Sequence, residues 1–196
     1  MTKYNVFVGR KIEIEAVERH FSQLSTAMLD GSPRIAVLHG KGGIGKTKLA
    51  SELGRRLKAK DVITTSVIDI KESGNRTLLS LLRTIADQVA PSVFAGFFEH
   101  LESYGRSNDA DRSKYQNLAV ETFLEILKGI VQATPVVVIL DTLESIQGTK
   151  FLETLLSLLP RCGGRCGFIL AGRNDIFLPT PIAKLSFKIS GFMAPD

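Results

Sequence analysis

Residues 40–47 of the chain read Gly40-Lys41-Gly42-Gly43-Ile44-Gly45-Lys46-Thr47. This segment matches the pattern G-x-x-x-x-G-K-[ST] at every fixed position. Its glycines let several backbone N–H groups point toward a bound polyphosphate without obstruction by side chains. The context fits as well, because the apolar run 35–38 predicts a buried strand before it and the leucine spacing after it predicts a helix over 45–60.

The loop supplies candidate ligands for a nucleotide. Lys46 is expected to bridge the β- and γ-phosphates, and the Thr47 hydroxyl is expected to bind Mg²⁺. The positive end of the helix that begins near Gly45 adds to this attraction. The structural alternative is a glycine-rich turn that only joins a strand to a helix. The predicted phosphate-binding set is Gly40, Lys41, Gly42, Gly43, Ile44, Gly45, Lys46, Thr47 and Lys48.

A second acidic site follows the apolar run 136–140, which predicts another buried strand ending at Asp141. Ligands of open α/β sheets bind at the carboxyl ends of the strands, so Asp141 is expected to face Thr47 and hold Mg²⁺. A helix N-cap is the alternative role of this aspartate. Glu144 is a candidate general base that polarises the attacking water, and its alternative is an ordinary surface glutamate.

Strand-like and helix-like segments alternate along the whole chain. Strands are expected over 35–38, 62–70, 136–140, 167–171 and 185–189, and helices over 10–29, 45–60, 78–89, 94–101, 118–130 and 151–159. This alternation predicts a three-layer α/β fold with a mostly parallel five-stranded sheet and helices on both faces. P-loop NTPases of the additional-strand branch insert one strand between the phosphate-loop strand and the acidic strand, which predicts the strand order 5-1-4-3-2. The polar segment 107–111 is expected to be a mobile loop.

Composition excludes several classes of protein. The 196 residues are 44% hydrophobic and 23% charged, which is typical of one globular domain and excludes disordered, collagen-like and coiled-coil chains. No apolar run reaches the 18 residues of a membrane span, and residues 1–5 lack a signal-peptide core, so a cytoplasmic protein is expected. Cys162 and Cys166 are expected to be free thiols on a glycine-rich loop, because a zinc site needs four ligands and the histidines are distant. The net charge of +5 includes no run of five like charges that would suggest a nucleic-acid tail.

Three further segments carry a family resemblance. Val6-Phe7-Val8-Gly9-Arg10, with Glu13 three residues on, resembles the F-V-G-R-x-x-E motif of the AAA-related STAND NTPases, which include the NB-ARC and NACHT domains. Leu140-Asp141-Thr142-Leu143-Glu144 resembles their L-D-N-L-E strand, and Ala171-Gly172-Arg173 resembles their strand-end arginine motif. With the phosphate loop, four motifs stand in the family's order between residues 6 and 173.

The resemblance implies roles for further residues. Val8, Gly9 and Arg10 would lie against the adenine, and Arg173 would contact the γ-phosphate and so distinguish ATP from ADP. A surface arginine that ends a strand is the alternative role of Arg173. Many AAA relatives carry an acidic residue where this chain has Thr142, which implies slow hydrolysis.

The resemblance also implies an organisation and a function. The chain would be one nucleotide-binding domain over 1–196, with the N-terminal motif and leading helix in 1–33 and the P-loop core in 34–190. The family's helical lid and winged-helix domains are expected to be absent from this chain. The implied function is an ATP- or ADP-binding regulatory ATPase whose slow Mg²⁺-dependent hydrolysis acts as a conformational switch. Its implied partners are the nucleotide and proteins bound through further domains or self-assembly, with no membrane insertion and no nucleic acid for this domain alone.

Two alternative functions remain open at this stage. Residues 41–47 also fit the K-G-G-x-G-K-T loop of the ParA/MinD partitioning ATPases, in which Lys41 would reach the phosphates of a partner subunit. A helix ahead of the loop and the absence of a D-x-P acidic strand weigh against that alternative. The other alternative is an interaction scaffold that binds nucleotide without useful turnover.

Overall fold

The computed structural model describes residues 9–29, 31–178 and 182–190 of the chain. The helices of this part are α1 (Lys11–Ser22), α2 (Lys46–Lys58), α3 (Leu78–Val89), α4 (Ala95–Arg106), α5 (Asp109–Ala133) and α6 (Lys150–Leu158). The strands are β1 (Arg34–His39), β2 (Ile63–Asp69), β3 (Val136–Asp141), β4 (Cys166–Gly172) and β5 (Ala183–Lys188). Short 3₁₀ helices are η1 (Gln23–Thr26), η2 (Ser73–Asn75), η3 (Leu143–Ile146) and η4 (Leu159–Cys162).

The five strands form one parallel sheet in the order β2-β3-β4-β1-β5. This is the predicted order 5-1-4-3-2 counted from the other edge, so the predicted fold class and topology are confirmed. Strand β4 lies between β1 and β3, with Ala171 opposite Leu38 and Leu170 opposite Leu140. The carboxyl ends of these three strands therefore meet at one edge of the sheet.

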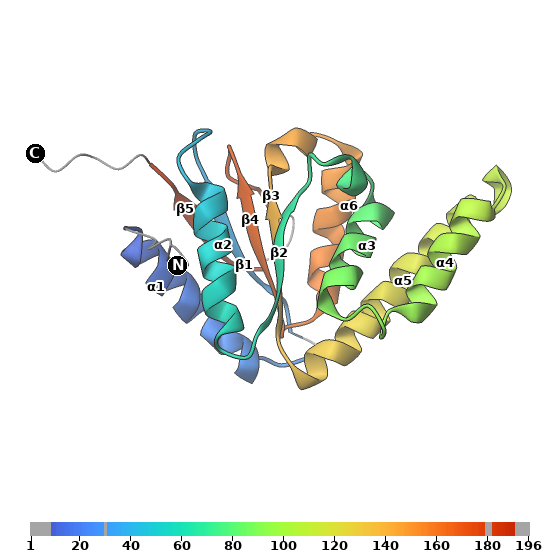
Figure 1. Cartoon of the computed structure of the whole chain (residues 1–196), viewed down its shortest axis with the longest axis horizontal. Helices are drawn as coiled ribbons and strands as arrows, with labels where there is room; N and C mark the ends of the chain where they lie inside the picture. The colour runs from blue at the N-terminus through green and yellow to red at the C-terminus, as the bar shows by residue number, and fades with distance from the viewer. Residues whose placement is uncertain (1–8, 30, 179–181, 191–196) are drawn as a thin grey trace, which may run out of the picture.

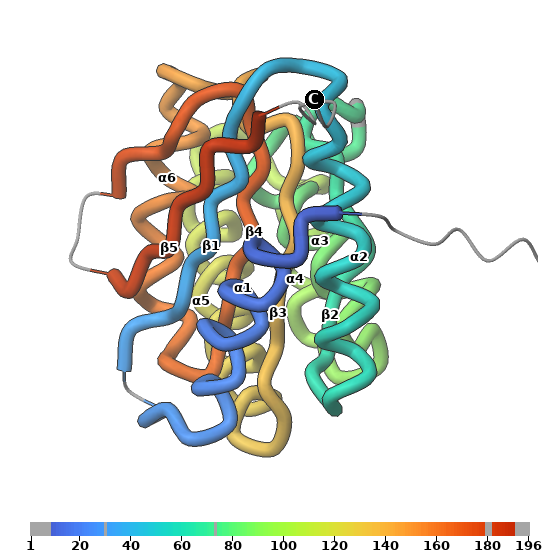
Figure 2. Tube along the Cα trace, turned by 90° about the vertical axis from the view of Figure 1, so that its left-hand side faces the viewer, coloured from blue at the N-terminus to red at the C-terminus, as the bar shows by residue number. Residues whose placement is uncertain are grey.

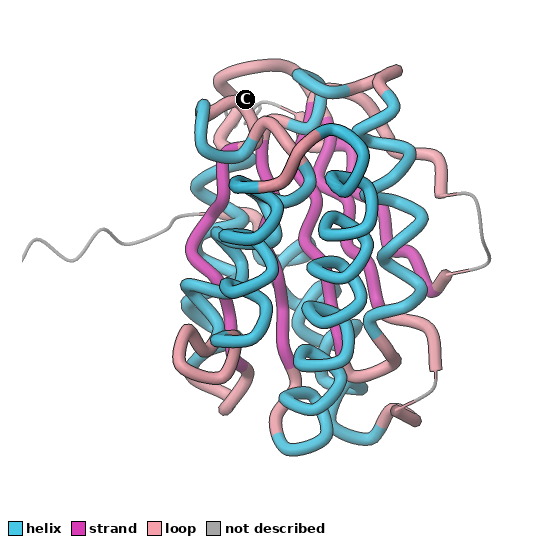
Figure 3. The backbone as a smooth tube through the Cα atoms, turned by 90° about the vertical axis from the view of Figure 1, so that its right-hand side faces the viewer, coloured by secondary structure: helices cyan, strands magenta, loops and turns pink. Residues whose placement is uncertain are grey.

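Helices cover both faces of the sheet, as Figure 1 shows. Alternate residues of β1 point to opposite faces, so Ala36 packs with α1 and α2 while Val37 packs with α3, α5 and α6. Figure 2 views the molecule from the side of α1 and α2, and Figure 3 shows the helices of the opposite side. Burial on both faces explains why the central strands are nearly continuous apolar runs rather than alternating ones.

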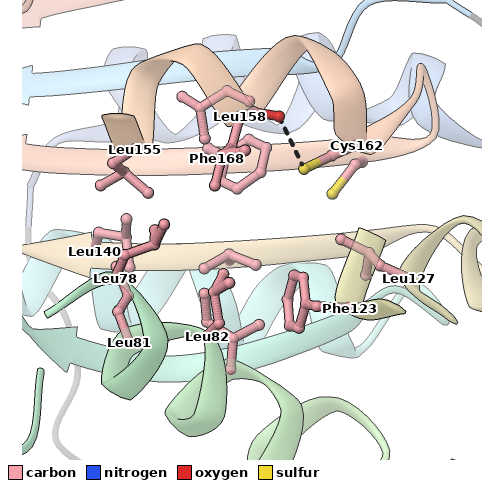
Figure 4. Packing of buried hydrophobic residues seen from close by; sticks show 14 of the residues in the cluster. Leu78, Leu81, Leu82, Phe123, Leu127, Leu140, Leu155, Leu158, Cys162 and Phe168 are labelled. Carbon is pink, nitrogen blue, oxygen red and sulfur yellow. Dashed lines mark hydrogen bonds between the residues drawn. The ribbon is translucent and has the colours of Figure 1, made fainter. Parts of the chain in front are cut away.

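The larger apolar core lies between β3, β4 and helices α3, α5 and α6 (Figure 4). The positions of the two cysteines in this core differ from the predicted glycine-rich loop. Both thiols are free, but they are buried, with Cys162 in η4 and Cys166 at the start of β4, rather than lying on a loop. The Cys162 thiol donates to the Leu158 carbonyl oxygen, with 3.6 Å between sulfur and oxygen. Both cysteines are thus part of the packing.

Helices α4 and α5 pack side by side at the edge of the molecule farthest from α1 (Figure 1). The predicted loop over 107–111 is too long, because α4 ends at Arg106 and α5 begins at Asp109, which leaves only Ser107 and Asn108 between the helices. The Asn108 side chain accepts a hydrogen bond from the Asp111 N–H at 3.0 Å and so caps α5, which begins at Asp109. Asparagine is a favoured N-cap and acidic residues suit a first helical turn, so the polar composition indicates a helix start. Among the described residues, no helix is long and apolar enough to cross a bilayer.

Candidate functional site

The loop between β1 and α2 borders a cavity of about 700 Å³ at the carboxyl edge of the sheet. Gly43 and Gly45 have φ angles of 77° and 92°, a conformation that side chains other than glycine rarely adopt. A Cβ atom at either position would meet no atom within 4 Å, so the backbone here faces open space. The residues that line this cavity are Gly42, Gly43, Ile44, Gly45, Lys46, Thr47, Lys48, Asp141, Thr142 and Glu144.

Lys46 is a buried cation at the floor of the loop, only 8% exposed. Its Nζ donates hydrogen bonds of 2.9 Å each to the carbonyl oxygens of Gly40 and Lys41. No acidic side chain forms an ion pair with it in the described part of the chain. An ammonium group removed from water and held only by neutral carbonyls attracts an anion strongly, because nothing compensates its charge.

Asp141 and Thr47 lie 94 positions apart in the sequence and meet at this cavity. The Thr47 hydroxyl donates a hydrogen bond to Asp141 Oδ2, and the Thr142 N–H donates to Asp141 Oδ1 at 2.7 Å. Asp141 is 7% exposed and has no basic partner within residues 9–29, 31–178 and 182–190. A buried, uncompensated carboxylate beside a hydroxyl oxygen fits a hard divalent cation such as Mg²⁺, which is usually held by one or two carboxylates plus phosphates and water.

Thr142 has a feature that sequence reasoning missed, since its φ of 64° is left-handed. This conformation is uncommon for a β-branched residue, and it turns the chain from β3 into η3. The turn brings Glu144 to the wall of the cavity. No residue type in the segment signals such a backbone, so the sequence alone could not have indicated it.

Glu144 and Arg173 form an ion pair across the ends of β3 and β4, with 3.2 Å between Arg173 Nε and Glu144 Oε1. The other carboxylate oxygen, Oε2, is buried and has no hydrogen-bond partner among the described residues. The Arg173 carbonyl oxygen accepts a hydrogen bond of 3.1 Å from the Gly40 N–H, which joins the end of β4 to the loop between β1 and α2. The structure therefore brings the predicted residues Lys46, Thr47, Asp141, Glu144 and Arg173 to one place.

Two residues of the N-terminal motif, Gly9 and Arg10, lie within the described part of the chain. Gly9 and Arg10 both have left-handed backbones, and the Arg10 guanidinium donates to Glu13 Oε1 at 3.2 Å and to the Ser190 carbonyl oxygen. Val8, the third predicted residue of this motif, lies outside the described residues. The sequence did not indicate that the chain after β5 packs against the start of the loop. A Cβ atom on Gly40 would lie 2.3 Å from the Ile189 carbonyl oxygen, so this position has no room for a side chain.

This arrangement of a glycine loop, a buried lysine and a facing threonine–aspartate pair on an all-parallel sheet defines the P-loop NTPase class of proteins. The comparison with protein families is more particular. Residues 6–169 match the family described as the AAA ATPase domain, and the chain belongs to that family. A search of curated protein sequences found no significant match.

Several solved structures share this fold. One is ORC2 of Aeropyrum pernix in ADPNP–ADP complexes, with a TM-score of 0.60 and 20% identity; the match covers 86% of this chain and 42% of that one. Drosophila ORC bound to DNA has a TM-score of 0.61 and 19% identity, and the match covers 92% of this chain and 43% of that one. Cdc6p of Pyrobaculum aerophilum has a TM-score of 0.54 and 17% identity, and the match covers 87% of this chain and 42% of that one. The chain spans a little over two fifths of the length of these proteins. At such identities the likeness establishes the fold alone.

Proposed function

We propose that this chain is the nucleotide-binding core of a STAND-type regulatory ATPase, which binds ATP or ADP with Mg²⁺ and hydrolyses ATP slowly. One observation carries the proposal. The Thr47–Asp141 contact and the buried Lys46 face the same open loop, although the residues come from different elements. A structural glycine turn needs neither a buried cation nor a buried carboxylate that lacks an ion-pair partner, whereas a site for a polyphosphate and a divalent cation needs both.

Phosphate binding would be mainly electrostatic. The N–H groups of the loop and of the start of α2 would donate hydrogen bonds to the phosphates, and the positive end of the helix dipole would add to this attraction. Lys46 adds a full charge in a setting shielded from water, where electrostatic interactions are stronger than at the surface. Together they would neutralise a polyphosphate over residues 40–48.

Thr47 and Asp141 are the residues that would hold the magnesium ion. When bound, Mg²⁺ supplies positive charge to the phosphate oxygens and to the leaving group. The hydrogen bond from the Thr47 hydroxyl to the Asp141 carboxylate keeps both oxygens beside the cavity before any ligand enters. The Thr142 N–H fixes the second carboxylate oxygen in the same way.

Glu144 and Arg173 would act at the terminal phosphate. Glu144 would accept a proton from the attacking water, and Arg173 would contact the γ-phosphate. The residue after Asp141 is Thr142, which cannot act as a base, and Glu144 is paired with Arg173. Both facts support slow turnover, with the bound nucleotide determining which surfaces are available to partners.

The relatives support the choice of nucleotide and the wider architecture. ORC2 of Aeropyrum pernix was solved with ADPNP and ADP, and we propose that Val8, Gly9 and Arg10 contact the base of the same nucleotides here. Within residues 1–196 we propose an N-terminal motif and leading helix over 1–33 and a P-loop core over 34–190. We assign the partners to further domains or self-assembly. Drosophila ORC was solved with DNA, but we assign no nucleic acid to this domain alone.

The alternatives differ in measurable ways. The scaffold alternative predicts tight nucleotide binding without turnover, whereas the switch predicts slow turnover that is lost on Glu144→Gln. The partitioning alternative predicts ATP-induced dimers that fail on Lys41→Ala. Membership of the AAA ATPase domain family favours the switch over the partitioning alternative.

The decisive experiment is identification of the nucleotide carried through purification, by mass spectrometry, followed by calorimetric titration. We expect adenine nucleotide in the wild type and no measurable binding by Lys46→Ala. Lys58→Ala, on the exposed last turn of α2, is the matched control and should bind like the wild type. Unchanged affinity of Lys46→Ala would refute the proposed site.

A further inference from the structure

The Glu144–Arg173 ion pair lies next to Gly42 in the loop between β1 and α2. The Arg173 Nη2 atom lies 3.9 Å from the position that a Cβ atom on Gly42 would take. The guanidinium group therefore lies beside both the Glu144 carboxylate and the loop between β1 and α2. An anion in the cavity and the Glu144 carboxylate would compete for the same guanidinium.

The two partners of this pair differ in their freedom to move. The Arg173 side chain is 66% exposed and can rotate, although its backbone is held by the Gly40 N–H. The Glu144 side chain is only 25% exposed, and its Oε2 atom is buried with no hydrogen-bond partner in the part of the chain that the structure describes. If Arg173 turns away, Glu144 loses its one ion-pair partner among the described residues and becomes a poorly compensated charge.

We infer that Glu144 lowers the preference of the site for triphosphate over diphosphate by competing with the terminal phosphate for Arg173. This inference rests on the proposed function. A triphosphate presents an additional charged group that must draw Arg173 from Glu144, whereas a diphosphate leaves the ion pair intact. The same exchange frees the Glu144 carboxylate only when a triphosphate is bound, so one ion pair both sets nucleotide preference and restrains the candidate base.

A second mechanism must be separated from this one. The Glu144 carboxylate lines the cavity and could repel the terminal phosphate directly, without any part played by Arg173. Direct repulsion would act equally whether or not the guanidinium is present. Competition for Arg173 would disappear when the guanidinium is removed, so a double-mutant cycle distinguishes the two.

The experiment is a calorimetric cycle on nucleotide-free protein with Mg²⁺. It compares the wild type, Glu144→Gln, Arg173→Ala and the double variant, each titrated with ADP and with ADPNP, which removes hydrolysis from the measurement. The readout is the ratio of the ADP to the ADPNP dissociation constant. Glu125→Gln, an exposed residue of α5, is the control for losing one negative charge.

We expect Glu144→Gln to raise this ratio roughly three- to tenfold, as for loss of one partly buried ion pair, and Glu125→Gln to leave it unchanged. In the Arg173→Ala background, Glu144→Gln should have no effect. A rise of equal size in both backgrounds, or no rise in the first, would overturn the inference while leaving the nucleotide site intact. If the folded wild type binds neither nucleotide, the proposed function fails and this inference fails with it.

Discussion

Replacement of Lys46 by Met tests whether the buried ammonium serves the ligand or the fold. Burial of an ammonium costs several kcal/mol, and the two carbonyl hydrogen bonds of Lys46 recover about 1.5–3 kcal/mol each. These effects nearly cancel, and methionine is an unbranched side chain that carries no charge. We therefore expect Lys46→Met to change the free energy of unfolding of the ligand-free protein by about 1 kcal/mol or less.

Nucleotide binding should respond very differently to the same change. A unit charge about 4 Å from the ammonium contributes about 4 kcal/mol at an effective dielectric constant of 20, which corresponds to about a thousandfold in affinity. Urea denaturation of stripped protein measures stability, and calorimetry with Mg²⁺–ADP measures binding. Lys58→Met at the exposed end of α2 should leave both unchanged. A stability loss above about 3 kcal/mol in Lys46→Met, or an affinity within threefold of the wild type, would refute this reasoning.

Two further predictions concern the fold. In Gly164→Ala the new Cβ atom would lie 2.2 Å from the Met28 carbonyl oxygen, so urea denaturation should show that the free energy of unfolding falls by about 2–4 kcal/mol. Gly129→Ala is the control, because a Cβ atom there faces open space on α5, and its free energy of unfolding should be unchanged or higher. Burial and the nearby Arg34 lower the pKa of His20 below the ordinary histidine value of about 6.5, so the folded state disfavours the protonated ring. Stability is therefore complete above pH 6.5 and falls as the pH drops below it, and the melting temperature of His20→Gln should depend less on pH between 7.5 and 5.5. An equal slope in both proteins would exclude His20 as the cause.

The sheet could be predicted from the sequence because its signals are local and strong. The runs before Gly40 and Asp141 are continuously apolar, and a strand buried on both faces requires that pattern. The start of α5 could not be predicted in this way. Asparagine is common both in loops and at helix N-caps, so Asn108 does not distinguish the two. The first turns of α5 also lack an apolar stripe, because the buried residues of this helix begin only at Ala119.

The candidate site shows the same division. Lys46, Thr47 and Asp141 could be predicted because fixed spacings and strand ends place them, whatever the rest of the chain does. The Glu144–Arg173 pair and the approach of Ile189 to Gly40 depend on which strands are neighbours and on the register between them. Those relationships join residues distant in the sequence, and no local pattern encodes them.

Strand order explains why an arginine at the end of β4 can take part in two interactions. Because β4 lies between β1 and β3, Arg173 stands next to the loop that follows β1 and to the η3 helix that follows β3. Were β1 and β3 direct neighbours, as in sheets without the inserted strand, a residue following β4 would have to reach across another strand. The hydrogen bond between Gly40 and Arg173 then fixes the backbone at this point, so only the side chain can exchange between Glu144 and a ligand. A local side-chain rotation is therefore sufficient to couple occupancy of the loop to the state of the candidate base.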